Sequence, residues 1–472
     1  MTDVQGIVDT AKYLRNVRPI DPEEIFEYVE GEPHPAVVRQ TLREHAFGLG
    51  LHEREDGTFV PIEDDPIAPA FRGVERFPER YARRVEELLV ERYGPDWPSG
   101  ESGAALRKRI DELKVAYFAD ESVTYDDETA LAYALYHLPD YYAAIQYVLD
   151  EVGRSRLLSR RMRVLDIGAG AGGPALGIHD YLPEESLVEY HAVEPSAAAD
   201  VFEAMVDLTR PGFATTVHRE TAEAFDPDGE YDLIVFGNVL SELDDPVAVV
   251  ERYLGSLAPE GTVLAVSPAE ERTATRLREI ERELLGRNDE LTVYAPTIRL
   301  WPDASPSDRG WTFTRKPEIE TPPFQRRLEE SAPEESGDTP GSGDRYTKPV
   351  VQFAYLLLRT DGTRAIEYEP DPDRVAKMAE TERHVTERID IAALKLSPNL
   401  ADDGHPLFKI SDGSEAIDHY AVLTDRSALN EVLSDAPYGS LLAFENALVL
   451  WNDDEEAYNL VVDGETVVDR VA

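Results

Sequence analysis

The sequence predicts an α/β protein built around a mostly parallel, Rossmann-like sheet, with a helical region before the sheet and a small β-barrel after it. A short apolar run at residues 163–167 leads into a glycine-dense loop, as where a buried parallel strand turns into a helix beneath a bound nucleotide. Strand-like and helix-like segments alternate through residues 153–365, which is typical of a sheet with helices on both faces. Short strands separated by turn residues fill residues 386–472 and indicate the barrel.

The glycine-dense loop fits two binding patterns. Gly168, Gly170 and Gly173 match the G-x-G-x-x-G loop of dinucleotide-binding proteins. Asp166 followed by Gly168, Gly170 and Gly172 matches acid-x-G-x-G-x-G, the loop of class I S-adenosylmethionine (SAM) methyltransferases. The acid favours SAM, because a carboxylate would repel a pyrophosphate but attract the cationic sulfonium and amino groups of SAM.

Segments downstream of the loop follow the class I methyltransferase order. Residues 188–193 read as a strand that ends at Glu194, roughly 20 residues past the loop, where an acid binds ribose hydroxyls. Residues 230–243 resemble the fourth strand of these enzymes and the loop after it, and residues 257–266 resemble the strand that follows. The order favours a SAM-type fold over a dehydrogenase.

Two further residues complete the predicted cofactor site. Asn238 lies just beyond the fourth strand, where a substrate would meet the methyl group. Glu220, after the third strand, is either a partner of the adenine amine or a surface acid. The residues predicted to bind SAM are therefore Asp166, Gly168, Gly170, Gly172, Glu194, Glu220 and Asn238.

Several segments together resemble the methyltransferase-like assembly factors of the small ribosomal subunit, whose mitochondrial members are called methyltransferase-like protein seventeen in animals. The matching segments are 165–170, 238–243, 295–296, 311–313, 322–328 and 353–358. The resemblance covers roughly residues 120–365, with a looser match in the barrel, and a cysteine-free member such as this chain would suit a haloarchaeal lineage. It implies a cytoplasmic SAM-binding protein whose partners are the small ribosomal subunit and its rRNA.

The chain departs from that family in having no cysteine. Family members carry cysteines around the segments that match Thr297 and Thr312, where they hold an iron–sulfur cluster, so the cluster does not transfer. The lack of cysteine also excludes disulfides, thiolate zinc sites and cysteine nucleophiles. The ten histidines show no ligand spacing, so no metal is expected. Packing of Trp301, Trp311 and Phe313 is expected to hold residues 295–328 instead.

The chain is strongly acidic, with a formal net charge of -47 from 94 acidic and 47 basic residues. Because the acids are spread along the whole chain, they indicate adaptation to a salt-rich cytoplasm. At 1 M salt the Debye length is about 3 Å, so an acidic surface would not exclude RNA. Two arginine clusters either contact phosphates or balance neighbouring acids: Arg154, Arg156, Arg160, Arg161 and Arg163 in one, Arg326 and Arg327 in the other.

The remaining regions have simpler expectations. Residues 1–66 predict a winged helix with Asp21 as a helix N-cap and a hairpin turn at Asp56-Gly57. Its third helix carries Arg39 and Arg43 and would either read nucleic acid or dock on a protein, with DNA the less expected partner. Residues 67–152 are expected to be helical, 329–345 a disordered insertion, 366–385 a linker, and 386–472 a barrel of the oligonucleotide-binding kind or a plain packing domain.

Catalytic residues stay unassigned. The Asp/Asn-Pro-Pro-aromatic signature of exocyclic-amine methyltransferases is absent, since Val239 and Leu240 follow Asn238. Three hypotheses remain: a SAM-binding factor of small-subunit assembly, with or without rRNA methylation; a SAM-dependent methyltransferase acting on a small molecule or a protein; and a winged-helix DNA-binding regulator. No apolar run is long enough to span a membrane, so no membrane association is expected.

Overall fold

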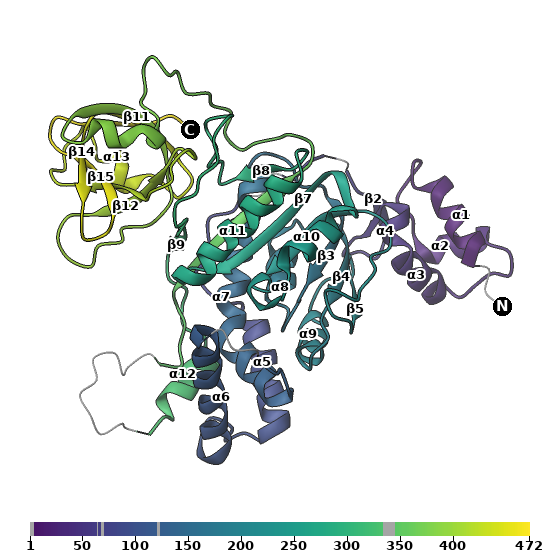
Figure 1. The fold of residues 1–472 in the computed structure, drawn as a ribbon. Helices are drawn as coiled ribbons and strands as arrows, with labels where there is room; N and C mark the ends of the chain where they lie inside the picture. Colours follow the sequence, from purple (N-terminus) through teal and green to yellow (C-terminus); the bar gives the residue numbers. More distant parts are fainter. Residues whose placement is uncertain (1–3, 64, 68–69, 120–122, 334–344) are drawn as a thin grey trace. The chain divides into compact units, whose positions relative to one another are not determined.

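The computed structural model describes residues 4–63, 65–67, 70–119, 123–333 and 345–472 (Figure 1). The chain forms two compact units. The first comprises residues 1–237, 256–258 and 318–349, and the second comprises residues 238–255, 259–317 and 350–472. Within the described part of the chain, no helix has both the length and the apolar character needed to cross a membrane.

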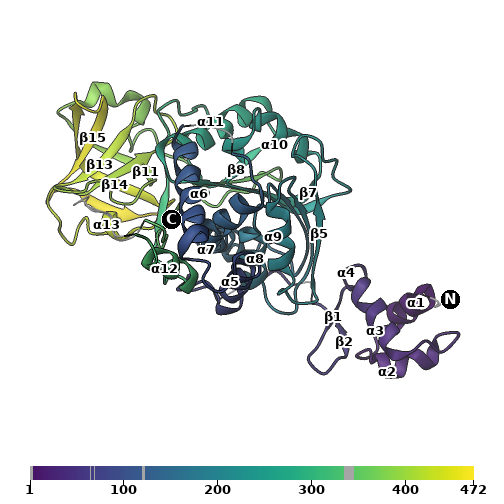
Figure 2. The same ribbon diagram turned by 90° about the horizontal axis from the view of Figure 1, so that it is seen from below.

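The N-terminal region of the first unit consists of short helices followed by a hairpin (Figure 2). Its elements are α1 (Val4–Leu14), α2 (Pro22–Ile25), the 3-10 helix η1 (Phe26–Tyr28), α3 (Pro35–Glu44), α4 (Ala46–Leu49), β1 (Leu51–Glu53) and β2 (Phe59–Pro61). The Asp21 side chain accepts a hydrogen bond from the Glu23 amide at 2.9 Å, which confirms the predicted N-cap. Helix α2 ends at Ile25, where the chain continues directly into η1.

Three long helices precede the sheet in the same unit: α5 (Glu79–Tyr93), α6 (Gly100–Ala119) and α7 (Asp127–Arg154). Helix α7 packs against α8 (Gly173–Tyr181) and α9 (Ala198–Val206). Two glycines allow α7 and α8 to approach closely. A Cβ on Gly177 would lie 2.1 Å from Ile145 Cγ2, and one on Gly173 would lie 2.9 Å from Tyr141 Cβ.

The central sheet has eight strands, with β9 (Thr314–Lys316) paired to β10 at one side. The other seven follow the order β5 (Phe213–His218), β4 (Leu187–Val193), β3 (Arg161–Ile167), β6 (Tyr231–Gly237), β7 (Leu257–Pro268), β10 (Val351–Arg359) and β8 (Thr292–Ala295). Strand β3 pairs in parallel with β4 on one side and with β6 on the other, so the strand order reverses at β3. Such a switch point forms a ligand crevice at the carboxyl ends of the strands.

The sheet confirms the predicted Rossmann-like α/β fold. Strand β10 runs antiparallel to β7, β8 and β9, so the sheet is mixed. In the second unit, α11 (Glu271–Arg287) contacts β10 and also packs against α10 (Pro246–Leu254), which follows the short 3-10 helix η2 (Leu240–Glu242).

The predicted disordered insertion at residues 329–345 begins inside a helix. Helix α12 (Pro323–Glu330) belongs to the first unit and includes the first two of these residues. Residues 334–344 lie outside the described residues.

Residues 388–470 form the predicted barrel. Its elements are β11 (Arg388–Lys395), β12 (Leu407–Ser411), β13 (His419–Leu423), α13 (Val432–Asp435), β14 (Leu441–Asn452), β15 (Ala457–Val462) and β16 (Val467–Arg470). The strands follow the order β11-β12-β13-β15-β14, and β14 pairs back to β11 and closes the ring. Met378, from the 3-10 helix η3 (Met378–His384) within the predicted linker, packs into the barrel core.

Residues 298–313 pack against the barrel within the second unit. Ile298 and Leu300 share a buried cluster with Leu394 and Leu441 of the barrel. The expected aromatic contacts are present, since the Trp311 ring stacks on Phe313 at 5.3 Å and Trp301 Nε1 donates to Asp412 Oδ2 at 2.7 Å. The aromatic residues do not act alone, because buried charges also join this segment to the barrel: Lys409 Nζ pairs with Asp308 and Asp418.

The contact between α7 and α8 gives a testable pair of variants. We expect Gly177→Ala to cost about 1–3 kcal/mol, because the new Cβ would also lie 2.7 Å from the Tyr142 carbonyl oxygen. The matched control is Gly286→Ala in α11, where nothing lies within 4 Å and alanine favours the helix. Thermal unfolding in molar salt measures both. An unchanged melting temperature for Gly177→Ala would contradict the close packing.

Candidate functional site

The glycine loop lies at the switch point, directly after β3, and opens α8. Gly168, Gly170 and Gly172 have φ angles of 70°, 54° and 92°, a backbone region that glycine adopts without strain. The amides of Gly168 and Ala169 donate to the carbonyl oxygen of Val193 at 2.9 and 3.2 Å, so the loop is bonded to the end of β4. The three glycines of the predicted SAM pattern therefore shape one turn at the mouth of the crevice.

Glu194 joins this turn to the next one. Its Oε2 accepts a hydrogen bond from the Gly170 amide at 2.9 Å, and its Oε1 accepts one from the Ser196 amide at 2.9 Å. The side chain is buried, and each carboxylate oxygen retains a lone pair for another donor. This arrangement fits the predicted role of Glu194 toward ribose hydroxyls.

Asp166 lies behind the loop rather than at its surface. It is 0% exposed, and its Oδ2 accepts a hydrogen bond from the Tyr190 hydroxyl at 2.6 Å. Burial raises the pKa of Asp166 to about 7; the hydrogen bond from Tyr190 lowers this pKa, and the nearby Glu194 raises it. The carboxyl supports the loop from the inside, and direct contact of Asp166 with a cationic ligand stays a prediction.

The end of β6 approaches the start of α8. A Cβ on Gly237 would lie 2.9 Å from Pro174 Cγ, so only glycine fits there without a shift. The next residue, Asn238, has a φ of 65°, a left-handed conformation that asparagine tolerates better than most residues, and its amide donates to the Val266 carbonyl at 2.9 Å. Glu220 is exposed after β5, and its role toward adenine stays a prediction.

One face of α7 adds residues that the sequence did not assign to the site. Tyr133, His137 and Tyr141 follow one another at helical spacing, and His137 lies 5.1 Å from each tyrosine between ring centroids. Tyr133 borders the loop, since a Cβ on Gly170 would lie 3.5 Å from its Cε1. With Tyr141 beside Gly173, this aromatic face lies against the glycine loop. The i, i+4 spacing of Tyr133, His137 and Tyr141 is the only sequence signal for this face.

His137 belongs to a small polar cluster. Lys348 Nζ donates to His137 Nδ1 at 2.9 Å and pairs with Asp140 Oδ2 at 2.8 Å. Burial, with a smaller effect from Lys348 and Lys114, holds the pKa of His137 well below its usual range. The imidazole is therefore neutral, and because Nδ1 accepts from Lys348, Nε2 carries the proton. Burial raises the pKa of Asp140 to about 6.

The first arginine cluster is largely paired with acids. Arg154 pairs with Asp150 at 2.5 Å, Arg160 with Glu185, and Arg163 with Glu189 at 3.3 Å. Arg161 lies over the Phe47 ring. In the second cluster, Arg327 pairs with Glu86, while Arg326 is exposed. These contacts favour the interpretation that the arginines balance neighbouring acids.

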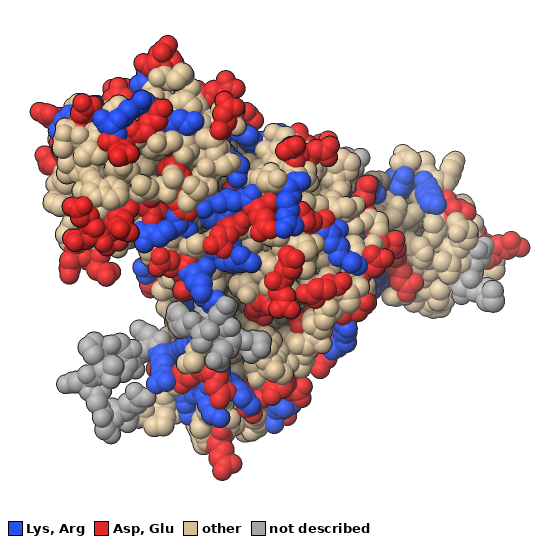
Figure 3. Space-filling view, viewed as in Figure 1, with Lys and Arg blue, Asp and Glu red and all other residues tan. Residues whose placement is uncertain are grey.

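The expected recognition helix α3 shows the same pattern. Arg43 Nε and Arg39 Nε lie 2.5 and 3.5 Å from the carboxylate of Glu53 in β1. Basic side chains on the face shown in Figure 3 are likewise interleaved with acidic ones. In the described ranges, no group of three or more histidine, aspartate or glutamate side chains is arranged to hold a metal ion.

Residues 165–263 match a family described as a methyltransferase domain. This match covers the glycine loop, Glu194 and Asn238, and it confirms the predicted methyltransferase fold and supports SAM as the cofactor. Residues 5–55 and 379–471 match the N-terminal and C-terminal domains of a domain of unknown function, DUF8157.

The search among curated proteins finds no match to this chain. Among solved structures, a plantazolicin methyltransferase in complex with S-adenosylhomocysteine is 12% identical, with 55% of this chain and 99% of that chain covered and a TM-score of 0.32. A SAM-dependent methyltransferase from Clostridium acetobutylicum is 12% identical over 29% of this chain and 54% of its own, with a TM-score of 0.23. A methyltransferase from Streptomyces caelestis is 21% identical over 29% and 52%, with a TM-score of 0.23.

The buried carboxyl of Asp166 predicts a pH-dependent effect. Between pH 4 and 7 the folded chain keeps this proton while the unfolded chain loses it, so Asp166 lowers stability as pH rises through that range. An amide has no such dependence. We expect the melting temperature of Asp166→Asn, relative to the natural chain, to rise by a few degrees between pH 5 and pH 8. Asp402→Asn, in an exposed loop, is the control. If the difference in melting temperature between Asp166→Asn and the natural chain stayed constant from pH 5 to pH 8, the raised pKa of Asp166 would be contradicted.

Proposed function

We propose that this chain binds SAM at the glycine loop and Glu194, and that it presents the methyl group to a substrate at the aromatic face of α7. The observation that carries the proposal is the loop itself. Three glycines at positive φ are tied through the Gly170 amide to Glu194, within residues that match a methyltransferase domain.

The residues of the chain fit this cofactor by position. SAM, when bound, supplies an electrophilic methyl group on a sulfonium centre. The glycine loop would hold its methionine part, and Glu194 would accept hydrogen bonds from its ribose. Methyl transfer depends mainly on holding the nucleophile in line with the methyl group. The neutral His137 can donate through Nε2 to orient a flat substrate against Tyr133 and Tyr141, because Lys348 fixes its tautomer.

We further propose that the partner is the immature small ribosomal subunit, where the chain acts in assembly with or without rRNA methylation. The support is the resemblance over residues 120–365. A net charge of -47 opposes RNA binding at low salt, whereas at 1 M salt the repulsion acts only over about 3 Å. A methyltransferase acting on a small molecule or a protein is the second candidate. A DNA-binding regulator is less favoured, because Glu53 occupies both arginines of α3.

Calorimetry in molar salt tests the cofactor. We expect SAM or S-adenosylhomocysteine to bind and NAD not to bind. Gly170→Val should abolish binding, because its φ of 54° disfavours a side chain and the new side chain would fill the space toward Tyr133. The control is Gly362→Val, which has a φ of 78° and open space around it. Binding of NAD without SAM would overturn the proposal.

Sedimentation in molar salt tests the partner. We expect the natural chain to travel with precursors of the small subunit and to be depleted from mature subunits. The Gly170→Val variant separates docking from cofactor use: if it still travels with precursors, the chain docks as a scaffold, and if it does not, docking needs the cofactor. If the natural chain never appears in precursor fractions, the assembly proposal fails and the second candidate takes its place.

A further inference from the structure

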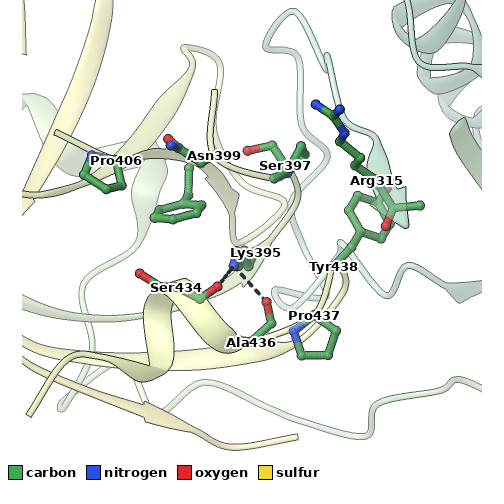
Figure 4. A pocket seen from close by; sticks show the side chains of 12 residues that line it. Arg315, Lys395, Ser397, Asn399, Pro406, Ser434, Ala436, Pro437 and Tyr438 are labelled. Carbon is green, nitrogen blue, oxygen red and sulfur yellow. Dashed lines mark hydrogen bonds between the residues drawn. The ribbon is translucent and has the colours of Figure 1, made fainter. Parts of the chain in front are cut away.

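A second cavity lies in the unit that contains the barrel, with a volume of about 420 Å³. Its walls come from β9, the end of β11, the loop that follows β11, the start of β12 and the residues just after α13. Figure 4 shows Lys395 on one wall, Ser397 and Asn399 above it, and Arg315 on a separate strand, with its guanidinium turned away from Lys395. The size is that of a small-molecule site.

The side chains that line this cavity carry positive charge, whereas the whole chain is strongly negative. Of the described residues that line it, two are basic, Lys395 and Arg315, and none is acidic. Acids outnumber bases two to one in the whole sequence, with 94 against 47. A basic cavity on such a chain favours an anionic ligand.

Lys395 is a buried cation without a carboxylate partner in the described chain. It is 4% exposed, and its Nζ donates to the carbonyl oxygens of Ser434 and Ala436 at 3.1 and 2.8 Å. An ammonium group has three donors, and the Lys395 Nζ also lies over the Phe408 ring of the cavity wall, 4.4 Å from the ring centroid. Burial lowers the pKa of Lys395 to about 8, and the exposed Asp435 nearby raises it. Lys409 on the neighbouring strand is equally buried but pairs with two aspartates.

The other walls suit an organic group attached to the anion. Phe408, Pro398, Pro406 and Pro437 give the cavity an apolar side. The Ser397 hydroxyl accepts from the Lys409 amide at 2.8 Å and keeps its own proton for donation. An apolar wall, a hydroxyl donor and two cations match the parts of a nucleotide: base, sugar and phosphate.

We propose that this cavity binds a nucleoside monophosphate unit, with Lys395 holding the phosphate, Arg315 adding positive charge to the cavity wall, and the apolar side holding the base and sugar. The unit is either a free mononucleotide or the phosphorylated end of an RNA strand, since both carry the same groups. The site is separate from the glycine loop, so the proposal does not depend on methyl transfer.

The test is calorimetry with uridine monophosphate on the full chain, with S-adenosylhomocysteine present in excess to fill the glycine-loop crevice. We expect uridine monophosphate to bind and uridine to bind at least about tenfold more weakly, because the phosphate meets charged donors. Lys395→Met should weaken binding about tenfold or more. Since Lys395 also bonds to the carbonyls after α13, the exposed Arg315→Gln is the second variant and should weaken binding several-fold without loss of folding.

The matched control is Arg470→Gln, an exposed arginine of β16 outside the cavity, which should bind as the natural chain does. A short RNA with a 5′-phosphate, compared with the same RNA carrying a 5′-hydroxyl, shows whether the bound nucleotide unit is a strand end or a free mononucleotide. Binding of the phosphorylated strand with the same sensitivity to Arg315→Gln assigns a strand end, and binding of the mononucleotide alone assigns a free nucleotide. The proposal is overturned if neither binds, or if binding is unchanged in both Lys395→Met and Arg315→Gln.

Discussion

The buried ammonium group of Lys409 is the interaction on which the second unit depends. It is 1% exposed and meets Asp308 from the segment before β9 and Asp418 from the turn before β13. Arg282 of α11 also pairs with Asp308, at 2.6 Å. Charges taken out of water are tolerated only with such partners, and loss of one partner typically costs about 3–5 kcal/mol. These buried charges therefore join the barrel, residues 298–313 and α11, beside the apolar cluster of Ile298 and Leu300 with the barrel.

That network explains how a chain without cysteine holds this region. The sequence suggested that aromatic packing would replace a metal cluster, and Trp301, Trp311 and Phe313 do pack there. The charges were not foreseen, because Lys409 and Asp308 are 101 residues apart and neither belongs to a recognisable pattern. An acidic composition makes such pairing easy to supply, since the sequence contains 94 aspartate and glutamate residues.

The features that the sequence predicted well are local ones. The glycine loop, the N-cap at Asp21 and the hairpin at Asp56-Gly57 each follow from residues a few positions apart, whose backbone preferences act without the rest of the fold. The closure of the barrel and the placement of Lys348 against His137, 211 residues away, depend on chain topology and leave no periodic signal. The left-handed backbone at Asn238 could not be predicted from the sequence either, because asparagine is also common in ordinary loops.

The contact of α7 with α8 through Gly173 and Gly177 makes the packing beside the glycine loop rigid. Helix α8 begins at the glycine loop and α7 carries the aromatic face, so the two helices cannot slide without steric overlap at these glycines. Lys348, from a segment 211 residues further along the chain, holds His137 of that face by a hydrogen bond. A substrate that approached the aromatic face would therefore meet side chains whose positions are already set.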